Sequence, residues 1–226
     1  MKRLIAGVGI NDAKYEIKKS IMLEERHSDG RKKQKTIWRC PIYHRWTNML
    51  YRCYSKSHIK RKPTYKGCTV CNEWLLFSNF RKWMVVQDWE GKHLDKDLLG
   101  EGKKVYSPET CVFVTLVVNN FTLSSSSTRG KYLVGVCWSK ISSKYQAYCG
   151  NPLTSKREHL GLYETELEAH LAWKKRKYEL ACILARSDYV TDKRVGKVLR
   201  ETYKNYTRLE DHTCYKKNIE IEEYKG

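Results

Sequence analysis

Hydrophobic residues in the first half of the chain recur at helical spacing in two segments. After Pro41, the pattern predicts a helix whose buried side is formed by Ile42, Trp46, Met49, Leu50 and Cys53. A second helix is expected over residues 74–87, with Phe77, Phe80, Trp83 and Met84 facing inward. The helical spacing of these aromatic residues indicates that they form a core, which supports the hairpin expected at residues 92–115.

The pattern of residues 92–123 predicts a strand, a loop of glycine and lysine, a second strand and a short helix. Side chains alternate between the two faces of a strand, so His93, Asp95 and Asp97 would share one face and Lys96 the other. Gly100 and Gly102 provide the reversal, residues 111–114 the return strand, and residues 116–123 a helix that carries Asn119.

The second half predicts three strands and two helices. Strands are expected over 132–138, 144–149 and 159–163, and a helix over 166–186 that begins with a capping box of Thr165 and Glu168. The inner face of this helix is expected to carry Leu167, Leu171, Tyr178, Cys182 and Ala185, with a basic patch over residues 174–177. A last helix over 192–206 carries Arg194, Lys197, Arg200 and Lys204, which form either a solvated face or a phosphate-contacting one.

These elements predict an α+β protein with two folded parts. The serine-rich residues 124–130 are the expected linker. The basic run 31–35 is expected to be a solvated loop, with a phosphate-contacting arm as the alternative. The expected divisions are 1–39 (strand and basic arm), 40–123 (first domain), 124–130 (linker), 131–187 (second domain) and 188–226 (basic helix and tail).

Charge narrows the choice of partner. The 226 residues contain 44 Lys or Arg and 25 Asp or Glu, a formal net charge of +19. Nucleic acid is the leading partner for such a chain, because Lys and Arg that neutralise phosphates release counterions. A membrane surface is disfavoured, since the basic residues are interleaved with Tyr and Trp and do not gather on an amphipathic terminal helix. With no signal peptide or bilayer-spanning run, we expect a soluble cytoplasmic protein, in the host cytoplasm if viral.

Nine cysteines without a secretory signal favour free thiols or a metal over a disulfide framework. Cys68 and Cys71 form a CxxC pair, and Cys40 and Cys53 lie upstream. Four thiolates can close a structural zinc site. The alternative is that these residues are buried thiols, because Cys53 falls in the apolar register of a helix.

The segment 92–123 resembles the HNH, or ββα-metal, nuclease motif of phage homing-endonuclease-like proteins. The similarity extends upstream through residues 7–13, 40–43, 52–55, 63–65 and 73–74. It implies a divalent ion, Mg²⁺ or Mn²⁺, held by Asp95 and Asn119, with Asp97 as a further ligand. Lys96 stands where the family usually carries its general-base histidine, and Thr110 falls near its middle asparagine.

The lysine changes the expected chemistry. A general base must be unprotonated near neutral pH, whereas lysine starts near pKa 10.4 and flanking Asp95 and Asp97 favour its charged form. A protonated Lys96 can hold a phosphate, and His93 is the alternative base. A third interpretation is a solvated ion-pair cluster on a degenerate nuclease scaffold.

The second domain resembles the APETALA2-type DNA-binding domain. The matching residues are Gly135-Val136, Trp138, residues 144–147, residues 160–163, Glu168-Ala169 and Ala172-Trp173. In that family the sheet enters the major groove, which implies contacts from Trp138, Lys140, Lys144, Tyr145 and Gln146. The side chains suit this role, because Gln can read adenine and Lys can reach guanine or phosphate. The alternative is that Trp138 and Tyr145 are ordinary sheet residues.

The sequence is therefore consistent with two different functions. The first is a phage HNH-type endonuclease that nicks or cleaves duplex DNA, with no small-molecule substrate. The second is a non-catalytic DNA-binding protein, such as a regulator, on the same scaffold. RNA binding is a third possibility that charge does not separate from these two.

Overall fold

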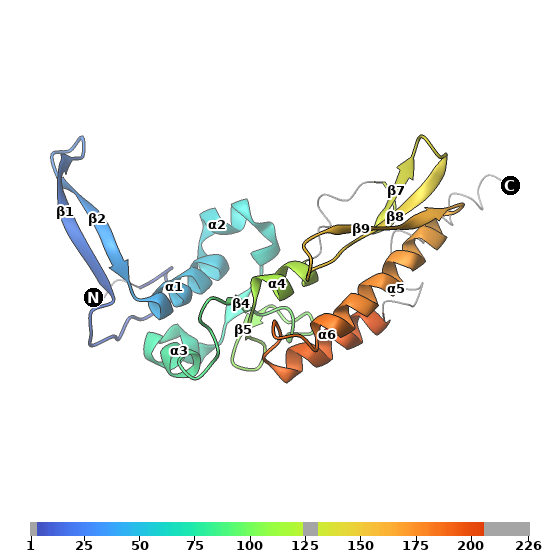
Figure 1. Ribbon diagram of the computed structural model, residues 1–226. Helices are drawn as coiled ribbons and strands as arrows, with labels where there is room; N and C mark the ends of the chain where they lie inside the picture. The colour runs from blue at the N-terminus through green and yellow to red at the C-terminus, as the bar shows by residue number, and fades with distance from the viewer. Residues whose placement is uncertain (1–3, 124–130, 206–226) are drawn as a thin grey trace. The chain divides into compact units, whose positions relative to one another are not determined.

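The computed structural model describes residues 4–123 and 131–205, coloured along the chain in Figure 1. The chain divides into two compact units, 1–113 and 114–226. The predicted serine linker, 124–130, and the chain after residue 205 lie outside the described residues. The units divide just before the short helix at residue 116, upstream of the predicted linker.

The first unit contains small sheets and helices. Its elements are β1 (Lys18–Arg26), β2 (Lys32–Arg39), α1 (Pro41–Tyr54), α2 (Lys56–Arg61), a 3₁₀ turn (Pro63–Tyr65), β3 (Thr69–Val70), a 3₁₀ turn (Asn72–Leu75), α3 (Phe77–Met84), β4 (His93–Asp95), β5 (Val105–Tyr106) and β6 (Val112–Val114), whose last residue begins the second unit. β1 pairs with β2, β3 with β5, and β4 with β6. The predicted strand–loop–strand therefore exists, but its loop also contributes β5 to a second pair.

Helix α1 forms the centre of the first core, as its apolar pattern predicts. Trp46 is fully buried, and its indole Nε1 donates a hydrogen bond to the carbonyl oxygen of Trp74 at 2.7 Å. Gly9 lies against this helix so closely that a Cβ there would approach Leu50 Cδ1 to 2.3 Å. Asp12 Oδ1 accepts the amide hydrogen of Ser78 at 2.9 Å, which satisfies one of the free amides at the start of α3. The glycine-containing N-terminal motif therefore has a packing role.

Two predictions for this unit were wrong. The basic run 31–35 belongs largely to strand β2, paired with β1, and is not a loop. The helix predicted over 74–87 is shorter, because a 3₁₀ turn precedes it and α3 covers only Phe77–Met84. In both places tertiary pairing outweighed the local pattern.

The second unit contains α4 (Leu116–Thr122), β7 (Val136–Ser139), β8 (Lys144–Gly150), β9 (Arg157–Tyr163), α5 (Glu166–Leu184) and α6 (Lys193–Asn205). The three strands form an antiparallel sheet in the order β7-β8-β9, and α5 packs against it. The predicted capping box at Thr165 and Glu168 is confirmed. Among the described residues, no helix has the length and apolar character needed to cross a membrane.

The predicted inner face of α5 was wrong. Leu171 is 40% exposed, whereas the buried side carries Ala169, His170, Trp173, Lys174, Leu180, Ala181 and Leu184. The helix is rotated because Trp173 packs against Gly135, where the absence of a side chain lets the indole approach the strand. The expected basic patch is consequently divided, with Lys174 buried and Arg176 ion-paired to Glu158.

Candidate nucleic-acid interface

The register of the three-stranded sheet assigns its residues to two faces. Along β8, Tyr145, Ala147 and Cys149 alternate with Lys144, Gln146 and Tyr148. Ala147 and Cys149 are buried, and they lie on the face that α5 covers. The other face, which we call the open face, carries Lys144, Gln146 and Tyr148 on this strand.

Trp138 and Tyr145 lie on the helix-bearing side. They are directly opposite each other in the register, and their rings meet edge-on at 4.8 Å between centroids. Tyr145 also meets the ring of Tyr132, at 5.7 Å. The candidate DNA-contacting residues from the sequence are therefore divided between the two faces, and these aromatic residues form a cluster with one another.

The open face carries a connected set of polar and aromatic side chains. Tyr148 Oη donates a hydrogen bond to Gln146 Oε1 at 2.9 Å. The Arg157 guanidinium lies over the Tyr148 ring, 4.1 Å from its centroid, and His159 is the cross-strand partner of Tyr148 at 5.0 Å between rings. Arginine stacked on an aromatic ring is held in place while its donors remain available.

Two lysines flank this set. Lys144 forms an ion pair with Glu164 at 2.5 Å, and Lys140 is exposed in the turn between β7 and β8. Sequence reasoning identified both, together with Gln146, but it missed Tyr148, Arg157 and His159. Strand alternation from Gln146 would have found Tyr148, whereas the other two required the register of β9.

The HNH-like segment has a defined local structure in the first unit. Lys96 is buried and forms an ion pair with Asp97, and its ammonium lies 5.8 Å from the centre of the Tyr106 ring. Burial opposes the charged form, but the hydrogen bond and charge of Asp97, with Cys68 and Asp95 adding to it, raise the pKa of Lys96 above its ordinary value. Lys96 therefore stays protonated at neutral pH, which disfavours proton abstraction by this residue.

The acidic residues of this segment differ in their surroundings. Asp95 Oδ1 accepts the amide hydrogens of Asp97 and Leu98, both at 2.8 Å, which closes a tight turn after β4. His93 is exposed on β4. Asn119, on α4, belongs to the second compact unit, whereas Asp95 belongs to the first. Within the described ranges, no group of three or more His, Cys, Asp or Glu side chains is arranged to hold a metal ion.

The candidate zinc cysteines are free thiols in the first core. Cys40, Cys53 and Cys68 are buried, and Cys71 is half-buried. Burial raises the pKa of Cys53 to about 12 and that of Cys71 to about 11. Among the described residues, these cysteines do not form a group of three or more side chains that could hold a metal ion, so the structural zinc site stays a prediction.

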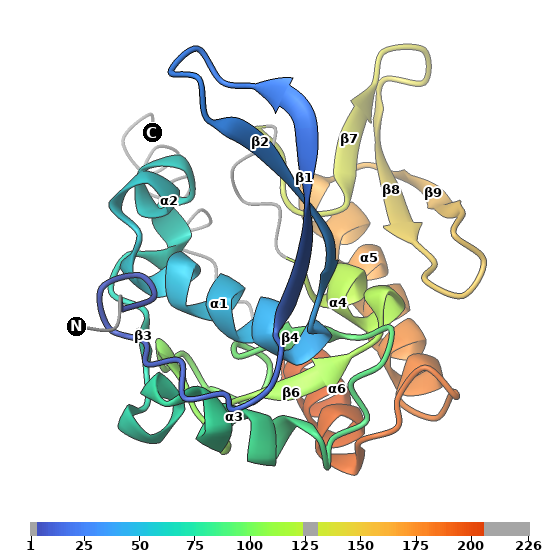
Figure 2. The ribbon, with the colours of Figure 1, turned by 90° about the vertical axis from the view of Figure 1, so that its left-hand side faces the viewer.

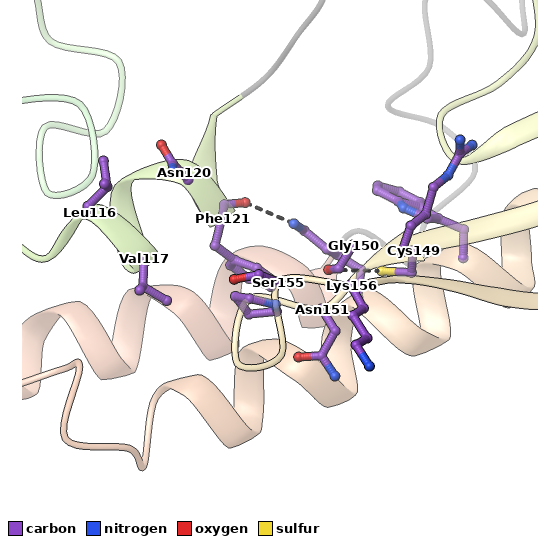
Figure 3. Close-up of a pocket in the computed structure, with 13 residues that line it drawn as sticks. Leu116, Val117, Asn120, Phe121, Cys149, Gly150, Asn151, Ser155 and Lys156 are labelled. Atoms are coloured by element: carbon purple, nitrogen blue, oxygen red, sulfur yellow. Dashed lines mark hydrogen bonds between the residues drawn. The ribbon is translucent and has the colours of Figure 1, made fainter.

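The second unit contains a pocket of about 580 Å³ between α4, the β8–β9 turn and α5. Asn120 and Phe121 lie on one side of it, and Asn151 and Lys156 on the other (Figure 3). Lys177 on α5 donates a hydrogen bond to the carbonyl oxygen of Phe121 at 2.8 Å. Burial lowers the pKa of this lysine to about 8.

Comparisons of the chain with protein-family models, with curated proteins and with solved structures gave no match.

Proposed function

We propose that this chain is a DNA-binding protein that contacts the duplex through the open face of the β7-β8-β9 sheet. The observation that carries the proposal is the connected group of Gln146, Tyr148 and Arg157 on the face that α5 leaves uncovered. Glutamine can make paired hydrogen bonds with adenine, and arginine can do so with guanine or with phosphate. The net charge of +19 supplies the general attraction to a polyanion.

Substitution of Arg157 tests this proposal. Arg157→Ala should weaken binding to a mixed-sequence DNA duplex roughly tenfold, the size of a lost arginine contact to a base or phosphate. Arg186→Ala is the matched control, because Arg186 is also exposed in the second unit and its loss removes the same charge. Fluorescence anisotropy at fixed salt gives both affinities. Equal effects of the two substitutions would contradict a specific role for the open face.

Competition with an RNA duplex of the same sequence separates DNA from RNA as the partner. The deep, narrow major groove of RNA does not admit a sheet, so the RNA should compete poorly. Preferential binding of the RNA duplex would reject DNA as the partner.

A second candidate function is metal-dependent cleavage of the bound DNA by a phage HNH-type endonuclease. It is favoured by the order of elements, because β4 pairs with β6 and the chain continues directly into α4. Asp95 and Asp97 offer the carboxylate oxygens that Mg²⁺ or Mn²⁺ prefers. The ion would supply charge neutralisation at the phosphate. Lys96 would hold the phosphate, and His93 would accept a proton.

Plasmid nicking with Mg²⁺ or Mn²⁺ tests this second candidate. Asp95→Asn is the sharpest variant, because the amide oxygen can still accept the two backbone hydrogen bonds while the charge is lost. We expect His93→Ala to reduce nicking at least a hundredfold, within the range for a proton-transferring group. Asp95→Asn should also reduce nicking strongly, because it removes the charge of a proposed metal ligand. If the wild-type protein binds DNA but cuts no plasmid with either metal, the cleavage function is rejected and the non-catalytic DNA-binding function is favoured.

A further inference from the structure

The strand pair β1–β2 is a ribbon with both faces open to solvent. Every residue of the two strands is exposed or half-buried, and no described helix of the first unit covers either face (Figures 1 and 2). An isolated two-stranded ribbon is marginally stable in water. Its length and exposure therefore indicate a surface that binds something outside its own unit.

The register gives the two faces different chemistry. One face, which we call the polar face, carries the cross-strand pairs Ser20–Thr36 and Met22–Gln34 in its middle and basic pairs at its ends, Lys18–Arg39 and Arg26–Lys32. The opposite face carries the pairs Lys19–Trp38 and Ile21–Lys35. Strand alternation separates the two sets, although irregularities occur on either side of the central pairs.

The charge of the ribbon favours a polyanion. Residues 18–39 contain eight Lys or Arg and three Asp or Glu, a net charge of +5. Two of the acids are already occupied, since Glu25 pairs with Lys33 at 2.8 Å and Asp29 pairs with Arg31 at 2.6 Å. Lys18 and Lys32 form no ion pair among the residues that the structure describes. These two lysines, at opposite ends of the polar face, are therefore the ones whose charges an added anion would neutralise.

We propose that the β1–β2 ribbon is a second nucleic-acid-binding element, whose polar face lies in the major groove of duplex DNA. The major groove, about 12 Å wide, admits a two-stranded ribbon. At a rise of about 3.3 Å per residue the two basic ends lie roughly 25 Å apart, which allows them to reach phosphates while the middle faces base edges. Gln34 and Thr36 are the base-contacting residues of this site.

Lysines on opposite faces of the ribbon provide a charge-matched test. The double variant Lys18→Gln/Lys32→Gln alters the polar face, and Lys19→Gln/Lys35→Gln alters the opposite face of the same strands. The first should weaken binding to a mixed-sequence duplex at least tenfold and reduce the salt slope of log K by about 2, since each lost phosphate contact removes about 0.9. The second should change affinity less than about threefold. Equal losses from both pairs, or no loss from either, would overturn the proposal.

Chemical protection identifies the groove and the side chains. Bound wild-type protein should protect guanine N7, a major-groove atom, from methylation by dimethyl sulfate. Gln34→Ala/Thr36→Ala should remove part of this protection, whereas Trp38→Ala should preserve it. Loss of protection with Trp38→Ala alone would place the opposite face on the DNA and overturn the assignment.

The ribbon inference takes its partner from the proposed function but can fail separately from it. If Arg157→Ala weakens binding and neither lysine double variant changes the affinity, the open face binds DNA and the ribbon does not. A second measurement tests binding of the protein to vesicles that contain phosphatidylserine. Vesicle binding that requires Trp38, with no effect of either lysine pair on duplex binding, would make the ribbon a lipid-surface element and reject the DNA assignment.

Discussion

Gly135 allows α5 to pack closely against the start of β7 in the second unit. Its backbone has φ of +83°, in the left-handed region, and a Cβ there would lie 2.2 Å from Trp173 Cγ. Any other side chain would therefore be strained in its backbone and would displace the indole. The contact between the start of β7 and α5 depends on this absence of a side chain.

Gly135→Ala should lower the free energy of unfolding of the second unit by about 3 kcal/mol, combining backbone strain with overpacking. Urea unfolding monitored by tryptophan fluorescence gives the value. Gly150→Ala is the control, because nothing lies within 4 Å of a Cβ there, and it should change stability by less than about 0.5 kcal/mol. Similar losses in both variants would contradict the packing argument.

Lys177 gives a prediction on pH. Its pKa in the folded protein is lowered to about 8, below an ordinary value of 10.5, because burial disfavours the charged form. Between these two pH values the unfolded chain binds more protons, so this lysine makes the free energy of unfolding rise with pH. Lys177→Met should lack this rise.

The measurement is urea unfolding of wild type and Lys177→Met at pH 7.5 and pH 10. The stability of wild type relative to the variant should increase toward the higher pH. Lys175→Met, at an exposed position on the same helix, should follow the wild-type profile. Parallel profiles for wild type and Lys177→Met would contradict the burial of an ammonium group at this position.

At the scale of elements, α5 begins where its sequence predicts. Thr165 Oγ1 accepts the amide hydrogen of Glu168 at 3.2 Å, and Glu168 Oε2 accepts that of Thr165 at 3.1 Å. This reciprocal pair depends only on residues three apart. The direction in which the helix faces the sheet depends instead on Trp173 and Gly135, which are distant in sequence.

Thr165→Ala should cost about 1 kcal/mol of unfolding free energy, the typical value of a lost N-cap. Chemical denaturation followed by far-ultraviolet circular dichroism provides the measurement. Thr165→Ser retains the accepting hydroxyl and should recover most of the loss. A serine variant as unstable as the alanine variant would show that the hydroxyl has no capping role.

At the scale of the whole molecule, the excess of 44 basic over 25 acidic residues leads us to expect that the proposed DNA binding depends on salt. Log K for a mixed-sequence duplex should fall linearly with log salt concentration, with a slope of about −0.9 for each phosphate contacted. We expect a slope steeper than about −4 if both proposed surfaces engage. Anisotropy titrations from low to physiological salt measure it, and a slope near zero would exclude phosphate contacts as the source of affinity.

Sequence by itself determined the α+β class, the positions of α1, α4 and α5, the three-stranded sheet and the capping box. These features follow from short-range periodicity and from local hydrogen bonds, which residues close in the chain specify. A resemblance in the sequence also marked Gln146, Lys144 and Lys140 as candidate contacts, and their side-chain chemistry suits that role.

Only the tertiary structure decided which side of α5 faces the sheet, because the predicted inner face of this helix was wrong. It turned residues 31–35 into a strand by pairing them with β1, and it rotated α5 around Trp173. It also buried Lys96 beside the Tyr106 ring and brought Arg157 over Tyr148. These arrangements depend on contacts between residues far apart in the chain, whose energies outweigh local preference and leave no periodic trace in the sequence.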